Sequence, residues 1–224
     1  IIGGGYIGLE MTEALTRRGI QTSIVEFMDS LLPGFDPSIG KIIRTRLESE
    51  GTKVYTGISV KTISPKGELL EVQGSNDFNI KSDLVLVSTG VVPDTALARE
   101  AGIETGIKNA IRVNGNMETN IPGIYAGGDC VETFHLITEK FTYIPLGTTA
   151  HKHGRIAGEN ICGKNVFYAG TLGTQSVKIF DLVAARTGLT DAEALKAGFD
   201  PLTIEFETWD HKVYYPGAKK VNIK

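Results

Sequence analysis

The sequence is poor in cysteine. Its 224 residues include only Cys130 and Cys162, which are far apart and form no CxxC pair. A disulfide framework needs more cysteines, and zinc or thioredoxin-like motifs need closely spaced ones. Because disulfides are rare in reducing compartments, this usage predicts a cytoplasmic protein. Isolated cysteines usually serve in packing, so both thiols are predicted to be structural.

Two further absences exclude classes of protein. No apolar run approaches the roughly 18 residues of a membrane-spanning helix, so no span is predicted. Lysine and arginine form no cluster and the formal net charge is −3, which argues against nucleic acid as the main partner. The remaining composition, 41% hydrophobic and 22% charged, is that of a globular protein with ample length for a core.

Glycine is abundant, and it forms the first informative pattern, in IIGGGYIGLEMTEALTRRG. Gly3, Gly5 and Gly8 match GxGxxG, with Tyr6 and Ile7 between the last two. In a dinucleotide-binding turn the first glycine permits a tight turn from strand to helix and the second lets the backbone approach a pyrophosphate. The third allows close packing of the helix. The turn therefore predicts a dinucleotide site.

The segments after the turn extend this prediction. The helix is predicted to end at Gly19 and to bury an apolar face. That face consists of Ile7, Met11, Ala14 and Leu15. The run QTSIVEF then predicts a buried strand ending in Glu26, eighteen residues after Gly8. An acidic side chain there can accept hydrogen bonds from ribose hydroxyls and repels a 2′-phosphate, so the pattern predicts NAD in preference to NADP.

Only Ile1 and Ile2 precede the turn, although a strand usually needs about five residues. The chain is therefore predicted to begin inside a strand of a longer protein. A second helix is predicted to begin at Asp36 and Pro37 and to end at Gly51, followed by a small antiparallel meander from residue 53 to 81. The apolar run SDLVLVSTG predicts a closing strand that leads into Gly90.

A second glycine-rich block is METNIPGIYAGGDCVE. IYA predicts a short strand, and Gly127, Gly128 and Asp129 follow directly. Glycines at a strand end let the backbone close on a ligand, and the carboxylate can bind a ribose or polyol chain. The alternative is that Asp129 caps a following helix, and the residues alone do not decide between the two.

The third block is IPLGTTAHKHGRIAGENICG. Thr148 or Thr149 is predicted to cap a helix that runs to about Cys162 and stops at Gly163. Two glycines one turn apart, at positions 154 and 158, predict another backbone packed closely on that face. The histidines at positions 151 and 153 do not share a face, so we expect solvated side chains and no metal site.

The last part of the sequence is β-rich. SVKIFDLVAART and LTIEFETWD flank a short helix whose entry, Thr190 with Glu193, is a capping box. HKVYYPGAKKVNIK predicts strand, turn and strand, and the chain is expected to end within a sheet.

Taken together, these blocks resemble the FAD-dependent pyridine nucleotide-disulfide oxidoreductases. The resemblance is strongest to the single-cysteine branch: coenzyme A-disulfide reductases, NADH oxidases, NADH peroxidases and NADH-dependent persulfide reductases. The stretches that carry it are GGGYIGLEM, VSTGVVPDT, TNIPGIYAGGDCVE, IPLGTTAHKHGRIAGENI, ARTGLT and YYPGAKK. They occur in family order across essentially the whole chain.

The resemblance implies an α/β fold in three parts. Residues 1–92 would form a Rossmann-like NAD domain with a truncated first strand, and residues 93–167 the C-terminal half of an FAD domain. Residues 168–224 would begin an α+β interface domain that makes a homodimer. Glu10 matches the position beside the nicotinamide, and Gly90 the loop that borders bound NAD.

The flavin residues are also implied by the resemblance. Asp129, after Gly128, matches the residue that binds the ribityl chain of FAD. Leu146, Gly147 and Thr148 match the segment that faces the flavin pyrimidine, where a helix N-terminus can stabilise negative charge.

The implied activity passes hydride from NADH through FAD to a redox-active cysteine. That cysteine would reduce a coenzyme A disulfide, a persulfide, or peroxide or oxygen. Neither cysteine of this chain matches its position. Tyr214 or Tyr215 fits a catalytic tyrosine near the thiol, the alternative being two strand tyrosines packed at a dimer interface. The rival function is a non-catalytic fragment that binds NAD and self-associates.

Overall fold

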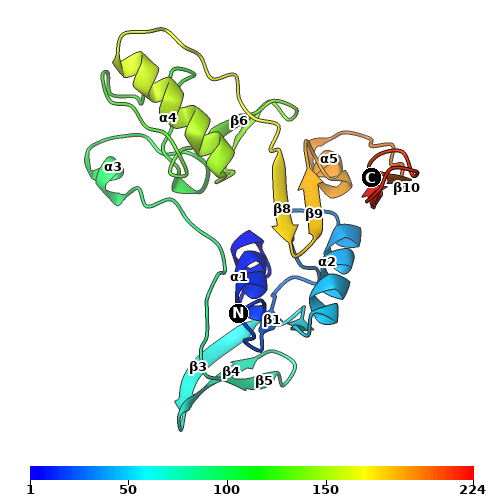
Figure 1. The fold of residues 1–224 in the computed structure, drawn as a ribbon. Helices are drawn as coiled ribbons and strands as arrows, with labels where there is room; N and C mark the ends of the chain where they lie inside the picture. Colours follow the sequence, from blue (N-terminus) through cyan, green and yellow to red (C-terminus); the bar gives the residue numbers. More distant parts are fainter. The chain divides into compact units, whose positions relative to one another are not determined.

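The computed structural model describes residues 1–224, which form two compact units, residues 1–188 and 189–224. The helices of the first unit are α1 (Tyr6–Thr16), α2 (Pro37–Ser49), α3 (Ala96–Glu100), the 3₁₀ helix η1 (Ile107–Asn109) and α4 (Gly147–Ile161). Its strands are β1 (Ser23–Val25), β2 (Lys53–Tyr55), β3 (Val60–Lys66), β4 (Leu69–Gly74), β5 (Asn79–Ser82), β6 (Thr133–His135), β7 (Lys140–Thr142), β8 (Gln175–Ile179) and β9 (Leu182–Arg186). The second unit holds α5 (Asp191–Ala197), β10 (Phe206–Trp209) and β11 (Lys220–Ile223) (Figure 1). No helix is both long and apolar enough to cross a membrane.

Parallel strands stand at the start of the first unit. β1 pairs with β2 in parallel, with Ser23 opposite Lys53. The prediction that residues 53–55 belong to the antiparallel meander is therefore wrong. Because α2 lies between the two strands in sequence, it carries the chain back so that both strands run the same way. Ile2 bridges Val25 in parallel, which gives the strand, helix and strand of a Rossmann-like unit.

The run SDLVLVSTG does not form the regular closing strand that its apolar residues predict. Apart from Ser82, which ends β5, its backbone pairing is limited to Ile2, whose N–H donates to the Leu86 carbonyl oxygen and whose own carbonyl oxygen accepts the Ser88 N–H. Because one residue supplies both hydrogen bonds, no ladder continues from it. The side chains of Leu84 and Val87 are exposed.

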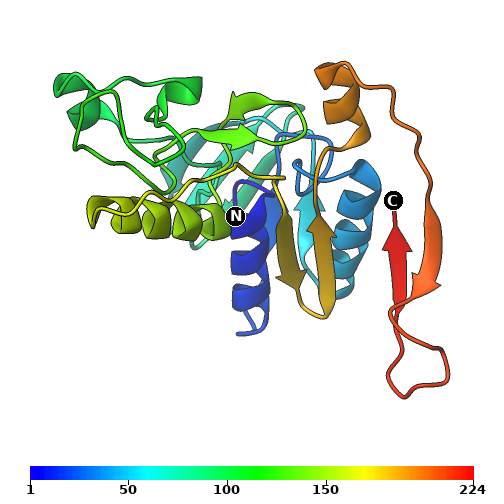
Figure 2. The ribbon, with the colours of Figure 1, turned by 90° about the horizontal axis from the view of Figure 1, so that it is seen from above.

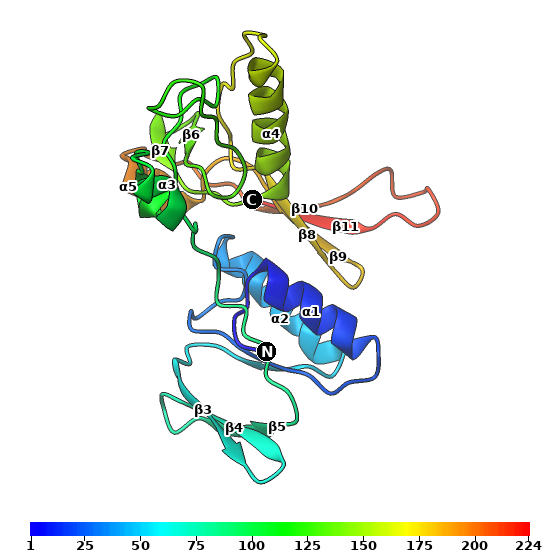
Figure 3. The same ribbon diagram turned by 90° about the vertical axis from the view of Figure 1, so that its left-hand side faces the viewer.

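Strands β3, β4 and β5 form an antiparallel sheet, which confirms the predicted meander. Figure 3 shows this sheet below α1 and α2. Its register shifts between Val60 and Thr62, at an irregularity of the kind that bends a strand.

The predicted helix ends are confirmed. After α1, Gly19 adopts φ +77° and its N–H donates to the Thr16 carbonyl oxygen. After α2, Gly51 adopts φ +88°. At the start of α2, the Asp36 carboxylate accepts the Ser38 N–H at 3.0 Å, as a capping residue should.

The buried face of α1 differs from the prediction. Gly8, Leu9 and Thr12 are buried, whereas Ile7 and Ala14 are exposed. Thr12 is accommodated because its hydroxyl donates to the Gly8 carbonyl oxygen at 2.7 Å. Leu9 is buried because it packs in a core that residues from the far end of the first unit complete.

That core is built around the β8–β9 hairpin, which the β-rich run SVKIFDLVAART predicts. Figure 2 shows the hairpin between α1 and α2, and β8 contacts α1 while β9 contacts α2. The buried residues of the core are Leu9, Ile24, Leu31, Leu32, Phe35, Ile43, Leu47, Val54, Val177, Ile179, Phe180 and Ala184. The helices of the nucleotide-binding motif are thus packed together by a distant hairpin.

A smaller core lies beside α4 and contains Ile111, Val113, Met117, Val131, Ile156 and Ala157. In the segment before α4, IYA forms a single bridge, from Tyr125 to Glu118, in place of the predicted strand. One paired residue in each segment is too few to make a strand.

The start of α4 also differs from the prediction. Leu146 is the N-cap and no side chain caps the helix, so neither Thr148 nor Thr149 has the predicted capping role. The reason is that Leu146 is already extended, at φ −138° and ψ 134°, and its carbonyl oxygen accepts the first helical hydrogen bonds. The predicted stop is confirmed, with Gly163 at φ +84°.

In the second unit the capping box is confirmed. The Thr190 hydroxyl accepts the Glu193 N–H, and the Glu193 carboxylate accepts the Thr190 N–H at 2.8 Å. β10 and β11 pair antiparallel. HKVYY forms turns rather than the predicted strand, because the chain reverses there and the Asp210 carboxylate accepts the Lys219 N–H at 3.0 Å.

Candidate functional site

A cavity of about 970 Å³ lies in the first unit. It brings together eight of the residues that the sequence singles out: Gly3, Gly5, Tyr6, Ile7, Glu26, Gly90, Leu146 and Gly147. Five others lie outside its lining: Gly8, Glu10, Gly128, Asp129 and Thr148. Residues predicted to bind two different cofactors therefore share one cavity.

The three glycines of the first turn occupy three different surroundings. Gly3 adopts φ +107°, and a Cβ there would overlap the Ser88 carbonyl oxygen. A Cβ on Gly8 would overlap the Gly3 carbonyl oxygen, so this glycine permits helix and turn to pack closely. At Gly5 a Cβ would meet nothing within 4 Å. Only the second glycine therefore leaves its space open to the cavity, as close approach of a pyrophosphate requires.

Two helix N-termini line the cavity. The N-cap residues are Gly5 for α1 and Leu146 for α4, and neither helix has a side-chain cap or an acidic residue in its first turn. The first N–H groups of a helix have no partner within the helix, and its N-terminus carries a partial positive charge. Two uncapped N-termini at one cavity suit a ligand with more than one anionic or electron-rich group.

Glu26 is buried at the end of β1 and faces the turn. One carboxylate oxygen accepts the Gly4 N–H at 2.5 Å and the other accepts the Met28 N–H at 2.7 Å. Each carboxylate oxygen has two lone pairs, so both keep capacity for a further donor such as a hydroxyl. The residue predicted to bind ribose therefore also shapes the glycine turn, a second role that the sequence pattern does not reveal.

Tyr6 begins α1 and lines the cavity. Its hydroxyl donates to the Gln175 side-chain oxygen, and its ring meets Phe35 edge-on at 6.1 Å between centroids. Burial raises the pKa of the Tyr6 phenol to about 12, although the Arg186 guanidinium acts in the opposite direction. The phenol is therefore neutral at physiological pH.

The Gly-Gly-Asp turn sits against α4. A Cβ on Gly127 would lie 3.2 Å from the carbonyl carbon of His153, and Gly128 adopts φ +92°. No helix follows Asp129, because the chain continues into the bridge from Val131 to Ile111 and then β6. The interpretation of Asp129 as a helix cap is therefore wrong. Its carboxylate is exposed.

Asp129 lies outside the cavity lining, but it acts on a residue of that lining. Burial and, after it, the Asp129 carboxylate raise the pKa of the Tyr143 phenol. The ribityl role of Asp129 stays a prediction.

His153 is fully buried, contrary to the prediction of a solvated side chain, whereas His151 is exposed. Neither ring nitrogen of His153 has a hydrogen-bond partner, and the ring meets Tyr168 edge-on at 4.6 Å. Gly127 packs closely on the helix and the Tyr168 ring lies against the imidazole, and both cover this side chain. The predicted close approach at Gly154 and Gly158 is wrong, because a Cβ on either would meet nothing within 4 Å.

We expect the stability of the chain to fall below about pH 6.5 because of His153. Burial lowers the pKa of this imidazole from its ordinary value of 6.5, although the Gly128 backbone and the Asp129 carboxylate oppose the effect. The unfolded chain then binds the proton more readily, so stability is complete above pH 6.5 and declines as pH falls. Urea unfolding from pH 5 to 8 measures the slope. His153→Phe should flatten it and His151→Gln should not; equal slopes in all three proteins would contradict the assignment.

The two cysteines differ in surroundings. Cys130 is half-buried, its thiol donates to the Gly127 carbonyl oxygen at 3.6 Å, and burial raises its pKa. A raised pKa disfavours the reactive thiolate. Cys162 is the exposed C-cap of α4. The structural role of both thiols stays a prediction.

The cavity also has lining residues that the sequence analysis missed, among them Ser88, Lys108 and Tyr143. The Ser88 hydroxyl donates to the Ile2 carbonyl oxygen at 3.1 Å. Lys108 adopts φ +52° and places its ammonium 5.7 Å from the Tyr143 ring centroid. Ser88 could have been found from its place two residues before Gly90; the other two carry no local signal.

Three predicted residues lie elsewhere. Glu10 is exposed on α1. Tyr214 and Tyr215 lie in the second unit, between β10 and β11, where both are exposed and their rings stack at 5.1 Å. The roles assigned to all three stay predictions.

Comparison with known proteins finds a matching family, similar sequences and similar structures. The family described as "Pyridine nucleotide-disulphide oxidoreductase" matches residues 1–154. The chain is 37% identical over 226 residues to the NAD(P)H sulfur oxidoreductase (CoA-dependent) of Pyrococcus furiosus, a match that covers 100% of this chain and 50% of that protein. It resembles the NAD-dependent persulfide reductase from A. fulgidus with a TM-score of 0.95 and 36% identity, over 99% of this chain and 41% of that chain.

A further similar structure is the water-forming NADH oxidase from Lactobacillus brevis bound to NADH, with a TM-score of 0.91 and 26% identity over 99% of this chain and 49% of that chain. An engineered NADPH oxidase derived from it, bound to NADPH, has a TM-score of 0.91 and 25% identity over the same shares. The chain spans about half the length of the curated relatives it matches. With a family match over residues 1–154, it belongs to the pyridine nucleotide-disulphide oxidoreductases.

Proposed function

We propose that this chain supplies the NAD(H) site and part of the FAD site of a flavoprotein disulfide reductase. The observation that carries the proposal is the single cavity at which the uncapped N-termini of α1 and α4 meet. In the complete enzyme, electrons from NADH reach a cysteine outside this chain. That cysteine reduces a coenzyme A disulfide, a persulfide, or peroxide or oxygen.

Family membership implies FAD and NAD(P)H as cofactors, and the residues present fit both. The open space at Gly5 and the N-terminus of α1 suit the pyrophosphate of NADH. The N-terminus of α4, at Leu146, Gly147 and Thr148, suits the electron-rich edge of a flavin. Bound FAD supplies the redox chemistry, since a flavin accepts hydride from a reduced nicotinamide.

In this proposal the other predicted residues orient the two cofactors. Gly128 and Asp129 bind the ribityl chain of FAD, Glu10 lies beside the nicotinamide, and Gly90 borders bound NAD. We divide the chain at the predicted boundaries: NAD domain 1–92, FAD half-domain 93–167, and interface domain 168–224, through which the protein forms a homodimer. Two cysteines without a disulfide support a reducing compartment such as the cytoplasm.

The preference for NAD over NADP rests on Glu26. The engineered NADPH oxidase carries substitutions of a glycine, an aspartate, an alanine, a methionine and a proline. Their spacing along that chain equals the spacing of Gly8, Glu26, Phe27, Met28 and Pro33 here. An acidic residue was thus removed, and an arginine introduced next to it, to obtain a protein that is bound to NADPH. This supports Glu26 as the residue that selects the unphosphorylated ribose.

The rival proposal is a non-catalytic fragment that binds NAD and self-associates. The absence of a suitable redox cysteine from residues 1–224 favours it for this chain taken alone. The two proposals differ in whether the protein holds FAD, because only an enzyme needs FAD bound tightly beside a thiol.

An absorption spectrum of the purified chain, with its intact mass measured on the same sample, tests these proposals. We expect NADH to bind, as followed by quenching of protein fluorescence. A flavin band near one equivalent supports an FAD site, whereas a colourless chain that binds NADH supports the fragment. A chain that binds neither cofactor contradicts both proposals.

A further inference from the structure

The tip of the β8–β9 hairpin has an unusual conformation. Ile179 pairs with Leu182, so Phe180 and Asp181 form a two-residue turn. Phe180 adopts φ +56° although it is only 5% exposed. Glycine and asparagine are the usual residues at positive φ in such turns, and a bulky residue remains there only when its surroundings hold it.

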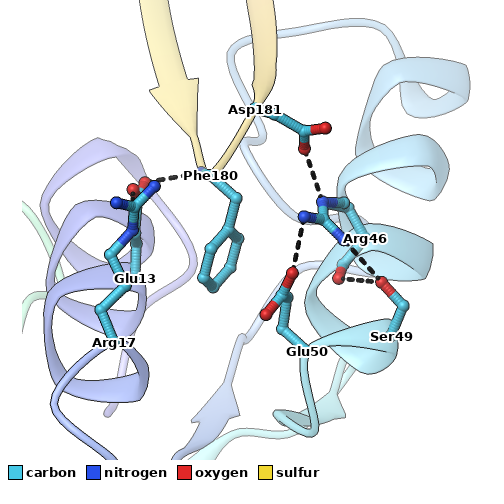
Figure 4. A network of polar contacts seen from close by, with 7 residues as sticks. All are labelled: Glu13, Arg17, Arg46, Ser49, Glu50, Phe180 and Asp181. Atoms are coloured by element: carbon cyan, nitrogen blue, oxygen red, sulfur yellow. Dashed lines mark hydrogen bonds and ion pairs between the residues drawn. The ribbon is translucent and has the colours of Figure 1, made fainter.

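The surroundings of Phe180 come from both helices (Figure 4). The Phe180 N–H donates to the Glu13 carboxylate of α1 at 2.6 Å. Its ring centroid lies 5.9 Å from the Arg17 guanidinium of α1 and 5.3 Å from the Arg46 guanidinium of α2. The aromatic ring thus contacts a cation on each side, an attractive arrangement for a ring face.

Ion pairs extend these contacts. Glu13 pairs with Arg17 at 2.8 Å. Arg46 pairs with Asp181 at 2.8 Å and with Glu50 at 2.6 Å. Two guanidinium groups therefore face three carboxylates, so this cluster offers no site for an anion. Its hydrogen bond and ion pairs instead link the hairpin tip to both helices.

The base of the hairpin also makes hydrogen bonds to neighbouring segments. Gln175, the first residue of β8, accepts the hydroxyl of Tyr6, and Arg186, the last residue of β9, donates to the Gly34 carbonyl oxygen. The hairpin therefore holds α1 at Tyr6 and at Glu13, about two helical turns apart. Between these points, Leu9 is in the same buried cluster as β8. Tyr6 lines the cavity, so this bracing reaches the nucleotide site.

We propose that the β8–β9 hairpin is a splint that fixes the N-terminus of α1, and that Glu13 is a positioning residue for NAD(H) binding. The inference rests on the proposed NAD(H) site. An uncapped helix N-terminus binds a pyrophosphate well only if its N–H groups keep their direction, because the hydrogen bonds weaken steeply with angle. Glu13 touches no nucleotide; it acts by holding α1 against the hairpin.

Glu13→Ala tests the splint, with Glu13→Gln and Glu48→Ala as controls. Glu13→Gln keeps an acceptor for the Phe180 N–H, and Glu48→Ala removes an exposed ion pair of α2 that does not contact the hairpin. We expect Glu13→Ala to weaken NADH binding about fivefold by calorimetry, and both controls to stay within about twofold. Hydrogen exchange without nucleotide should be faster in the first turns of α1 only in Glu13→Ala.

The outcomes separate the splint from the proposed function. A Glu13→Ala protein that unfolds at a lower temperature, yet keeps wild-type NADH affinity and wild-type hydrogen exchange in α1, would overturn the splint. Failure of the wild-type chain to bind NADH would contradict the proposed function and, with it, the role of Glu13 in NAD(H) binding, whereas the exchange measurement would still decide whether the hairpin fixes α1. If Glu13→Ala does not fold, Gln175→Ala removes the contact at the other end of the hairpin and should weaken NADH binding likewise.

Discussion

Gly5→Ala is expected to weaken NADH binding about tenfold or more, since one added carbon atom in a binding pocket can change affinity by about that factor. The new methyl group would enter the space left for the pyrophosphate. Folding should be almost unaffected, because Gly5 has an ordinary φ of −79° and its Cβ would meet no atom within 4 Å. Calorimetric titration with NADH measures the first effect and urea unfolding the second.

Gly3→Ala is the matched control, and its main expected effect is a loss of stability. A left-handed conformation costs an L-residue about 1–2 kcal/mol, and overpacking typically costs about 1–3 kcal/mol. Gly3 incurs both costs, with φ +107° and the Ser88 carbonyl oxygen in the way. We expect the free energy of unfolding to fall by about 2–5 kcal/mol. Equal losses of stability in both variants would show that the two glycines do not have separate roles.

Exchanging Glu26 for Ala together with Phe27 for Arg is expected to reverse the preference from NADH to NADPH. Phe27 is exposed and lines the cavity beside Glu26, so an arginine there can reach a 2′-phosphate. Hydrogen bonds to charged groups contribute about 1.5–3 kcal/mol, so NADPH should bind about ten- to hundredfold more tightly than to the wild-type chain. NADH should bind more weakly. Titrations with both nucleotides measure the change.

The single substitutions separate the two contributions. Glu26→Ala leaves the Gly4 and Met28 N–H groups without their acceptor, which should lower the free energy of unfolding by about 2 kcal/mol. Phe27→Arg alone should leave stability nearly unchanged and gain little NADPH affinity, because Glu26 still repels the phosphate. An unchanged preference in the double variant would remove the basis for assigning Glu26 to the ribose.

Local chemistry made much of this structure predictable. A glycine turn, a capping aspartate and a capping box act over a few residues, and the structure has α1, α2 and α5 where those signals place them. The prediction of the buried face of α1 was wrong because periodicity does not say which neighbour a helix will have. Leu9 and Thr12 are buried, and Leu9 packs with residues 177–184.

The candidate site divides in the same way. Gly5 and Glu26 carry sequence signals because the turn fixes their spacing. Gln175 and Tyr143 carry none, since they reach Tyr6 and the cavity from segments far along the chain. His153 was misjudged because its burial depends on Gly127, which packs on the helix from another block.

The position of the β8–β9 hairpin also has a consequence for synthesis on the ribosome. The hydrogen bond between Glu13 and Phe180 joins residues 167 positions apart, and Leu9 shares its core with Val177. Translation adds about 5–20 residues per second, so roughly 10–30 s separate the emergence of the nucleotide helix from that of its packing partner. Throughout that interval Leu9 and Ile43 lack part of their apolar cover. These side chains are then more exposed to solvent than in the folded protein, and a pause in translation before residue 175 would lengthen that exposure.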